Sequence, residues 1–303
     1  MLNGIITPLI TPLKLDQLSL DITSLNKIIE HVIAGGVHGI FILGTTGEAP
    51  NISYTTRRHL IIETVKITKN RVPVVVGISD TSIEESLELA SLSKEVGATA
   101  VVATPPYYYG LSSIELFKYF WHLANKLPLP LYLYNMPLHT KINIDVETVL
   151  QLAEHPNIVG LKDSSANTVY FQKLCHMFKN SDFDLFVGPE EITPEMVVMG
   201  ASGGVNGGSN LFPKLYVSLY QAALAKDFDR VYELHNLVMK ISTNIYNVGS
   251  FGSSYLKGMK GAASLLGLTN NTIAPPFNNF EEKEMDKLRK ALKIIRFKVD
   301  EII

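Results

Sequence analysis

The chain has 303 residues, of which 46% are hydrophobic and 18% are charged, a balance typical of a globular protein with a large buried core. Its formal net charge of -2, without any block of like charges, argues against nucleic acid or an anionic membrane as a partner. There is no secretion signal pattern and no apolar run long enough to span a bilayer, so we expect a cytoplasmic protein.

Short apolar segments alternate with amphipathic helical segments over residues 1–226. The predicted strands cover residues 4–10, 39–43, 74–77, 100–103, 130–135, 158–162, 184–188 and 203–205. The predicted helices cover residues 22–34, 54–68, 81–96, 113–126, 145–153, 167–178, 193–199 and 210–226. Such strand-then-helix units predict a (β/α)8 TIM barrel, an α/β fold. An open doubly wound sheet is the alternative, but the Gly-x-Gly-x-x-Gly turn that it requires after an early strand is missing.

Capping residues mark several helix ends. Ser53 and Thr81 are predicted N-caps, with Glu84 completing a capping box after Thr81. Gly35 and Gly97 stand where C-terminal glycines belong.

No further strand is predicted beyond residue 226. Residues 227–246, 253–266 and 280–299 read as helices, and Pro275-Pro276 interrupts the connection. We therefore expect a catalytic barrel over residues 1–226 and a C-terminal helical extension over 227–303. Cys175 is the only cysteine, so no intrachain disulfide forms, and its place in a predicted helix indicates a packing role.

In this fold the chemistry lies at the carboxyl ends of the strands, where Lys162 stands out. Side chains alternate along a strand, so Ile158 and Gly160 are expected on the Lys162 face. Val159 and Leu161 are expected on the opposite face. Desolvation disfavours an ammonium, and a neutral amine is a nucleophile towards carbonyls. The alternative reading is a strand-end lysine that simply reaches solvent.

Three other strand ends carry polar groups. The turn Gly44-Thr-Thr-Gly-Glu48 offers hydroxyls and amides for a carboxylate, although a turn without a ligand fits equally well. Three tyrosines follow Pro105-Pro106. Tyr134 and Lys162 are expected at equivalent positions on adjacent strands, where a phenol beside an amine suits imine chemistry.

Taken together, these motifs resemble one known family. Gly44-Thr-Thr-Gly-Glu48, Pro105-Pro-Tyr-Tyr-Tyr109, Tyr134-Asn-Met-Pro137 and Gly160-Leu-Lys-Asp-Ser164 are similar, in this order, to motifs of the dihydrodipicolinate synthase/N-acetylneuraminate lyase family of class I, pyruvate-dependent aldolases. The resemblance covers essentially the whole chain. It implies a homotetramer built as a dimer of dimers, pyruvate as a substrate or product, and no metal or organic cofactor.

The resemblance also implies catalytic roles. Lys162 corresponds to the Schiff-base lysine and Tyr134 to the tyrosine that relays protons. Thr45 and Thr46 correspond to the pair that binds the pyruvoyl carboxylate and joins the relay, supported by the Gly47 amide. Tyr108 corresponds to a tyrosine that reaches the active site of a neighbouring subunit. The backbone of Val205 corresponds to a position that faces the imine.

Other positions bear on the second substrate. Dihydrodipicolinate synthases carry an arginine for the carboxylate of aspartate semialdehyde where this chain has His139, and histidine cannot form that bidentate contact. Gly188-Pro-Glu-Glu-Ile192 resembles the stretch with which the lyases bind sugar hydroxyls, so Gly188, Glu190 and Glu191 are candidate contacts. The two glutamates could instead complement a helix start. Ser164 stands where the lyases have a threonine, but Gly207 stands where they have a serine.

We therefore expect an aldol lyase for a 2-oxo-3-deoxy sugar acid of the N-acetylneuraminate or 2-keto-3-deoxygluconate type. Dihydrodipicolinate synthase is the alternative, and a hydratase or dehydratase using the same imine is a close rival. A non-catalytic 2-oxo acid binding protein is the alternative of another class, although it would not need Lys162, Tyr134 and Thr45 together. A metal-dependent aldolase is disfavoured because the eight histidines lack zinc-type spacing. The glycine-rich turn after the eighth strand also fits a phosphate cradle.

Overall fold

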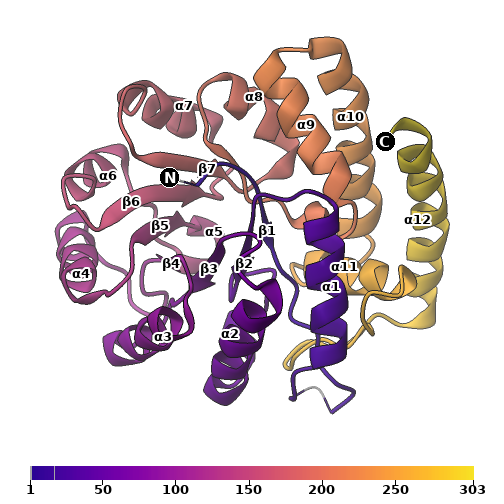
Figure 1. The fold of residues 1–303 in the computed structure, drawn as a ribbon, viewed down its shortest axis with the longest axis horizontal. Coiled ribbons are helices and arrows are strands. Elements are labelled where there is room, and N and C mark those ends of the chain that lie inside the picture. The colour runs from indigo at the N-terminus through magenta and orange to yellow at the C-terminus, as the bar shows by residue number, and fades with distance from the viewer. Residues whose placement is uncertain (1, 17) are drawn as a thin grey trace.

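Eight parallel strands close into a barrel in the order β1 to β8, which confirms the predicted (β/α)8 fold (Figure 1). The computed structural model describes residues 2–16 and 18–303. The strands are β1 (Gly4–Pro8), β2 (Gly39–Ile42), β3 (Val74–Gly77), β4 (Ala100–Ala103), β5 (Leu131–Asn135), β6 (Ile158–Asp163), β7 (Asp184–Val187) and β8 (Gly203–Gly204). Each lies on a predicted strand, with differences confined to the ends.

Helices surround the strands on the outside of the barrel (Figure 1). They are α1 (Ile22–Ala34), α2 (Tyr54–Thr68), α3 (Ile83–Val96), α4 (Ser113–Lys126), α6 (Val146–Leu152), α7 (Thr168–Met177), α8 (Thr193–Val198) and α9 (Pro213–Ala225). Four short helical turns in the loops were not predicted: η1 (Ala49–Asn51), α5 (Pro137–Thr140), η2 (Glu190–Ile192) and η3 (Gly207–Asn210). Helix α5 contains His139, η2 contains Glu190 and Glu191, and η3 begins two residues after Val205.

Side-chain alternation divides the buried residues into two layers. Outward-facing residues such as Ile40, Val101 and Leu133 pack between the strands and the helices. Inward-facing residues, including Phe41 and Tyr134, fill the interior of the barrel. The interior is therefore a packed core, and the site can form only where the strands end.

Two residues of β6 face the opposite way from the prediction, because the strand contains a β-bulge. The register between β5 and β6 shifts after Leu131, so that Tyr132 pairs with Gly160. Ile158 consequently joins the outer layer, whereas Val159 packs against the barrel interior, the reverse of the expectation. Beyond the bulge, the predicted pairing of Tyr134 with Lys162 is confirmed.

The helix caps agree with the sequence except at α3. Ser53 accepts a hydrogen bond from the Thr56 amide, and Gly35 and Gly97 end α1 and α3 as predicted. The predicted cap at Thr81 is wrong, because Ser82 caps α3 and the helix begins one residue later. Asp80 accepts a hydrogen bond from the Ser82 amide, which holds this turn outside the helix.

Three helices and one π-helical turn follow the barrel: α10 (Phe228–Ile241), η4 (Ser242–Tyr246), α11 (Ser254–Leu265) and α12 (Glu282–Ile302). Helix α12, yellow in Figure 1, lies on the outside of α10 and α11. Cys175 is buried in α7, and burial raises the pKa of its thiol to about 11, in line with a packing role. In the part of the chain that the structure describes, no helix is long and apolar enough to cross a membrane.

Candidate active site

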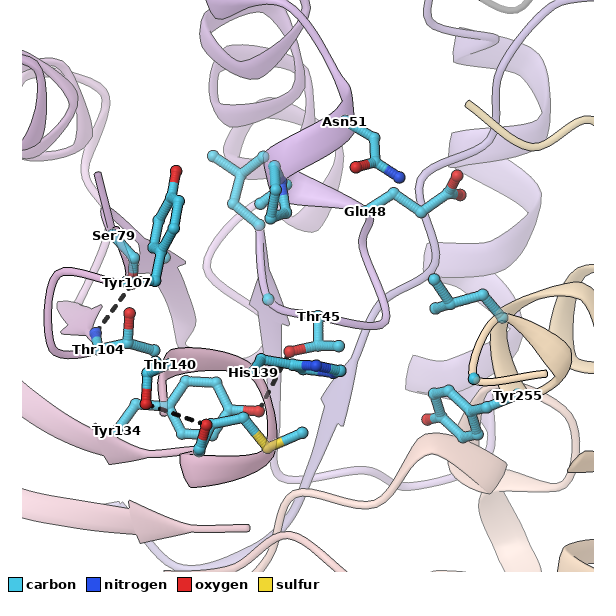
Figure 2. Close-up of a pocket in the computed structure, with 18 of the residues that line it drawn as sticks. Thr45, Glu48, Asn51, Ser79, Thr104, Tyr107, Tyr134, His139, Thr140 and Tyr255 are labelled. Atoms are coloured by element: carbon cyan, nitrogen blue, oxygen red, sulfur yellow. Dashed lines mark hydrogen bonds between the residues drawn. The ribbon is translucent and has the colours of Figure 1, made fainter. Parts of the chain in front are cut away.

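A cavity of about 610 Å³ opens at the carboxyl ends of β2 to β5 (Figure 2). Its walls include Thr45 after β2, Ser79 after β3, Tyr107 after β4, and Tyr134 and His139 in and after β5. The helical extension closes another side with Phe251, Gly252, Ser253, Tyr255, Leu256 and Phe277. The cavity thus belongs jointly to the barrel and the extension.

Lys162 lies beside this cavity, near the carboxyl end of β6. Its side chain is 7% exposed because β6 directs it inward between aromatic rings. Its Nζ lies 4.0 Å from the centroid of the Tyr134 ring and 5.0 Å from that of the Phe41 ring. These ring faces hold the amine through cation–π contacts, next to the one phenol that the register places beside it.

Tyr134 connects the lysine with the β2 turn. Its hydroxyl lies 3.3 Å from Thr45 Oγ1, as the dashed line in Figure 2 shows. Burial raises the pKa of Tyr134, but the charge of Lys162 and the nearby polar groups of Thr45 and Ser164 outweigh it and leave the pKa below its ordinary value. A phenol with a lowered pKa can take up and return a proton more readily than a free one.

The turn from Gly44 to Glu48 is held in an unusual backbone conformation. Leu43, directly before the turn, and Glu48, its last residue, both have positive φ angles, 59° and 57°. The Gly47 amide donates to the Gly44 carbonyl at 3.1 Å. The prediction that this amide supports a substrate carboxylate therefore does not fit, because its hydrogen is used inside the turn.

Glu48 fixes this turn to the helical extension through contacts that the sequence did not reveal. Its side chain is 1% exposed and lies 2.5 Å from the Nζ of Lys260 in α11, which is 2% exposed. The Ala274 amide also donates to Glu48 Oε2, at 2.8 Å. Glu48 is the last residue of the motif over residues 44–48, so the sequence did draw attention to it. Its partner Lys260, however, lies more than two hundred residues further along the chain.

Thr46 contacts α11 in the helical extension. Its Oγ1 lies 3.1 Å from the hydroxyl of Tyr255, which lines the cavity. Thr45 and Thr46 are therefore each paired with a different phenol. Tyr255 was missed by sequence reasoning because it lies in the helical extension, outside the strand ends.

Glu190 has a place different from the predicted one. It is 4% exposed, and its Oε1 accepts hydrogen bonds from the hydroxyls of Tyr216 and Tyr246, the latter at 2.7 Å. Its Oε2 accepts one from the Gly208 amide at 2.9 Å. The prediction that Glu190 contacts the substrate does not fit these contacts, because both oxygens are bonded inside the protein.

Glu191 is half-buried and also absent from the cavity wall. Its Oε1 accepts a hydrogen bond from the Ser242 hydroxyl, and its carbonyl lies 2.6 Å from His235 Nε2. Gly188 and Ser164 meet at the ends of β7 and β6, where a Cβ on Gly188 would lie 2.0 Å from Ser164 Oγ. Gly188 therefore makes room for Ser164 instead of providing a side chain for binding.

The remaining predicted residues divide between the cavity and other surfaces. His139 lines the cavity from α5, whereas Val205 is buried in the barrel interior. Tyr108 is 78% exposed and does not line the cavity of its own chain, while the adjacent Tyr107 does. A role for Tyr108 in a neighbouring subunit stays a prediction.

The glycine-rich turn after β8 does not provide a phosphate cradle. A Cβ on Gly207 would lie 1.9 Å from the Tyr255 hydroxyl, and one on Gly208 would lie 1.8 Å from the Tyr216 hydroxyl. The two glycines admit phenol groups of the protein itself, so the space above the turn is filled. In the described residues, no three histidine, cysteine, aspartate or glutamate side chains gather as metal ligands would.

The chain is similar over its whole length to proteins of one family. The profile described as the Dihydrodipicolinate synthetase family matches residues 1–295. The 4-hydroxy-tetrahydrodipicolinate synthase of Methanoculleus marisnigri is 32% identical over 299 residues, covering 96% of this chain and 99% of that protein. The structure of dihydrodipicolinate synthase from Bacteroides thetaiotaomicron is 54% identical, covers 97% of this chain and 98% of that one, and has a TM-score of 0.94. That of the chloride-inhibited dihydrodipicolinate synthase from Acinetobacter baumannii complexed with pyruvate is 29% identical, covers 98% and 99%, and has a TM-score of 0.91.

Proposed function

Because the chain belongs to the dihydrodipicolinate synthetase family and hence to the pyruvate-dependent class I aldolases, we propose that Lys162 forms an imine with pyruvate or a 2-oxo acid. The enzyme is of the carbon–carbon lyase or synthase type. The proposal for Lys162 is supported by its burial beside Tyr134 at the mouth of the barrel and by the cavity next to it. A relative complexed with pyruvate supports the choice of keto acid.

The proposed reaction follows from the positions of three groups. Lys162 first loses its ammonium proton to water, and the neutral amine attacks the 2-oxo carbon. Loss of water from the carbinolamine then gives the imine. Tyr134, in contact with Thr45, delivers the proton that the departing hydroxide needs and accepts one from the substrate hydroxyl when the carbon–carbon bond breaks. The electron pair of that bond passes into the imine and forms an enamine. Protonation and hydrolysis then release pyruvate, and the aldehyde leaves as the second product.

One observation supports the proposed class of aldehyde. The residues that line the cavity include neither arginine nor lysine, and their one carboxylate, that of Glu48, is paired with Lys260. Desolvation and the nearby charge of Lys141 lower the pKa of His139, which favours the uncharged form of its ring. An uncharged, hydroxylated aldehyde fits this wall better than one with a carboxylate. We therefore propose cleavage of a 2-oxo-3-deoxy sugar acid of the 2-keto-3-deoxygluconate or N-acetylneuraminate type.

Dihydrodipicolinate synthase is the second candidate. It is favoured by the activity for which the similar proteins are named, including a synthase structure with 54% identity over nearly the whole chain. In that reaction the enamine formed on Lys162 would attack aspartate semialdehyde. The replacement of the expected arginine by His139 is the specific observation against it.

The imine is tested by borohydride reduction in the presence of pyruvate, followed by intact and peptide mass spectrometry. Reduction turns the imine into a stable secondary amine, so we expect a pyruvate-sized adduct on the peptide that contains Lys162. A folded sample without this adduct would contradict the proposal. An aldehyde screen with glyceraldehyde, N-acetylmannosamine, sugar aldehydes and aspartate semialdehyde then separates the two candidates.

A further inference from the structure

Two adjacent threonines in the β2 turn contact two phenols that lie in opposite electrostatic surroundings. Thr45 contacts Tyr134, whose hydroxyl lies near the cation of Lys162. Thr46 contacts Tyr255, which lies near the carboxylate of Glu190. The first phenol is suited to exchanging a proton and the second to keeping one.

Tyr255 belongs to a cluster of three tyrosines near Glu190, together with Tyr216 and Tyr246. Its neighbours in this cluster hold it in place. The Tyr246 hydroxyl donates to Glu190, and its ring packs edge-to-face against Tyr255 with the ring centroids 4.8 Å apart. Gly207 leaves the space that the Tyr255 hydroxyl occupies, because a Cβ there would lie 1.9 Å from it. These contacts come from η2, η3, η4 and α11, so the position of Tyr255 is determined from several sides.

The direction of the hydrogen bond between Tyr255 and Thr46 matters for anion binding. A threonine hydroxyl has one hydrogen, so it can donate to a carboxylate only if its other neighbour donates to it. Burial, and then the charge of Glu190, raise the pKa of Tyr255, so this phenol keeps its proton. Among the described residues, Thr46 Oγ1 is the only hydrogen-bond partner of the Tyr255 hydroxyl. The phenol hydrogen is therefore satisfied only if Tyr255 donates to Thr46, and the Thr46 hydrogen is then left to point at a bound anion.

We infer that Tyr255, anchored by Tyr246 and Glu190, is a positioning residue that orients the Thr46 hydroxyl as a donor to the carboxylate of the 2-oxo acid. This inference rests on the proposed function, because it requires pyruvate to bind above the β2 turn. It gives the helical extension a part in substrate binding and gives Glu190 a role that does not require contact with the substrate.

The test compares Tyr255→Phe with wild type in steady-state cleavage and in the dependence of borohydride adduct yield on pyruvate concentration. We expect the KM for the 2-oxo acid, and the pyruvate concentration for half-maximal adduct, to rise about tenfold, with kcat changed less than about twofold. Tyr246→Phe, which removes only the anchoring hydroxyl, is expected to give a smaller rise in the same direction. Tyr220→Phe is the matched control, because it removes a hydroxyl that contacts the Ser202 carbonyl at the opposite end of the barrel.

A double-mutant cycle with Thr46→Val decides whether Tyr255 acts through Thr46. If it does, the double variant has the same KM as Thr46→Val alone, whereas independent roles give additive effects and overturn the inference. An unchanged KM in a folded Tyr255→Phe enzyme also overturns it, and the adduct on Lys162 still forms in that case. If wild type forms no adduct at all, the proposed function fails first and the inference fails with it.

Discussion

At the scale of single residues, the site depends on a lysine that two rings hold and a phenol that the lysine charge activates. Lys162 and Tyr134 lie side by side because their strands pair in register. Both residues stand on strands, so their contact does not depend on a loop. Rigid elements fix reacting groups more accurately than loops do. Substitutions at these positions should therefore affect chemistry without affecting the fold.

Lys162→Ala removes the proposed nucleophile. We expect a loss of kcat of about 10³-fold or more, because the aldol bond cannot break without the imine as electron sink, while the circular dichroism spectrum stays that of wild type. Lys173→Ala, an exposed lysine on α7, is the matched control and should retain full activity. Undiminished turnover by Lys162→Ala would refute the imine mechanism.

His139→Arg places a fixed cation in the cavity wall. A bidentate contact between guanidinium and carboxylate is worth enough to raise kcat/KM for aspartate semialdehyde by about tenfold. Steady-state kinetics of the same variant with an uncharged sugar aldehyde should show a lower kcat/KM than wild type. If neither value changes, position 139 does not select the second substrate.

At the scale of elements, the β2 turn is held from outside the barrel. Helix α11 contributes Lys260 to Glu48 and Tyr255 to Thr46, on the two sides of Gly47. A turn with positive φ angles at both ends costs conformational energy, and buried partners can offset that cost. The helical extension is therefore part of the support for the site.

Lys260→Met breaks the buried ion pair and leaves Glu48 without its partner. Removing one member of such a pair typically destabilises a protein by about 3–5 kcal/mol, because the other charge stays buried. Urea denaturation should show this loss, whereas Glu48→Gln combined with Lys260→Met should recover much of it. Equal stabilities of the single and double variants would show that the remaining charge is not desolvated.

Glu190→Gln tests the electrostatics of the tyrosine cluster. Burial, followed by the charge of Glu191, raises the pKa of Glu190 from 4.5 to about 7. Between these values the folded protein binds a proton that the unfolded chain has released, so this group makes the free energy of unfolding fall as pH rises from about 5 to about 7. The total contribution is about 3 kcal/mol.

The measurement for this prediction is urea denaturation at pH 5 and pH 8. The unfolding free energy should decrease from pH 5 to pH 8 in wild type, and this decrease should be smaller by about 3 kcal/mol in Glu190→Gln. Identical pH dependence in the two proteins would mean that Glu190 does not titrate in this range.

At the scale of the whole molecule, Tyr108 and its neighbours lie on an exposed surface next to the cavity. Tyr108 and Tyr109 are 78% and 76% exposed in the single chain, and their rings pack edge-to-face. Exposed aromatic residues of this kind favour contact with another subunit. We propose the homotetramer on this basis together with the resemblance to the family.

Subunit mixing tests whether Tyr108 acts in a neighbouring site. Lys162→Ala and Tyr108→Phe are each expected to be nearly inactive, but a mixed dimer contains one site with both groups intact. Random reassembly of equal amounts should therefore restore about a quarter of wild-type activity, measured after refolding the two variants together. No recovery in a sample shown to contain mixed oligomers would place Tyr108 outside the neighbouring site.

The barrel, the strand that carries Lys162 and the pairing of Lys162 with Tyr134 could all be predicted from the amino-acid sequence. These features depend on local periodicity and on the parallel order of the strands, both of which neighbouring residues specify. The bulge at Val159 could not be predicted from the sequence, because a register shift depends on how two strands fit together in space.

How the β2 turn is held, and what Glu190 does, became clear only from contacts between distant parts of the chain. Glu48, Thr46 and Glu190 each meet partners from the helical extension, and such contacts leave no periodic signal along the chain. A carboxylate in a loop looks the same in the sequence whether it faces solvent, substrate or buried phenols. Its burial and its hydrogen-bond donors decide between these roles, and both exist only in the folded protein.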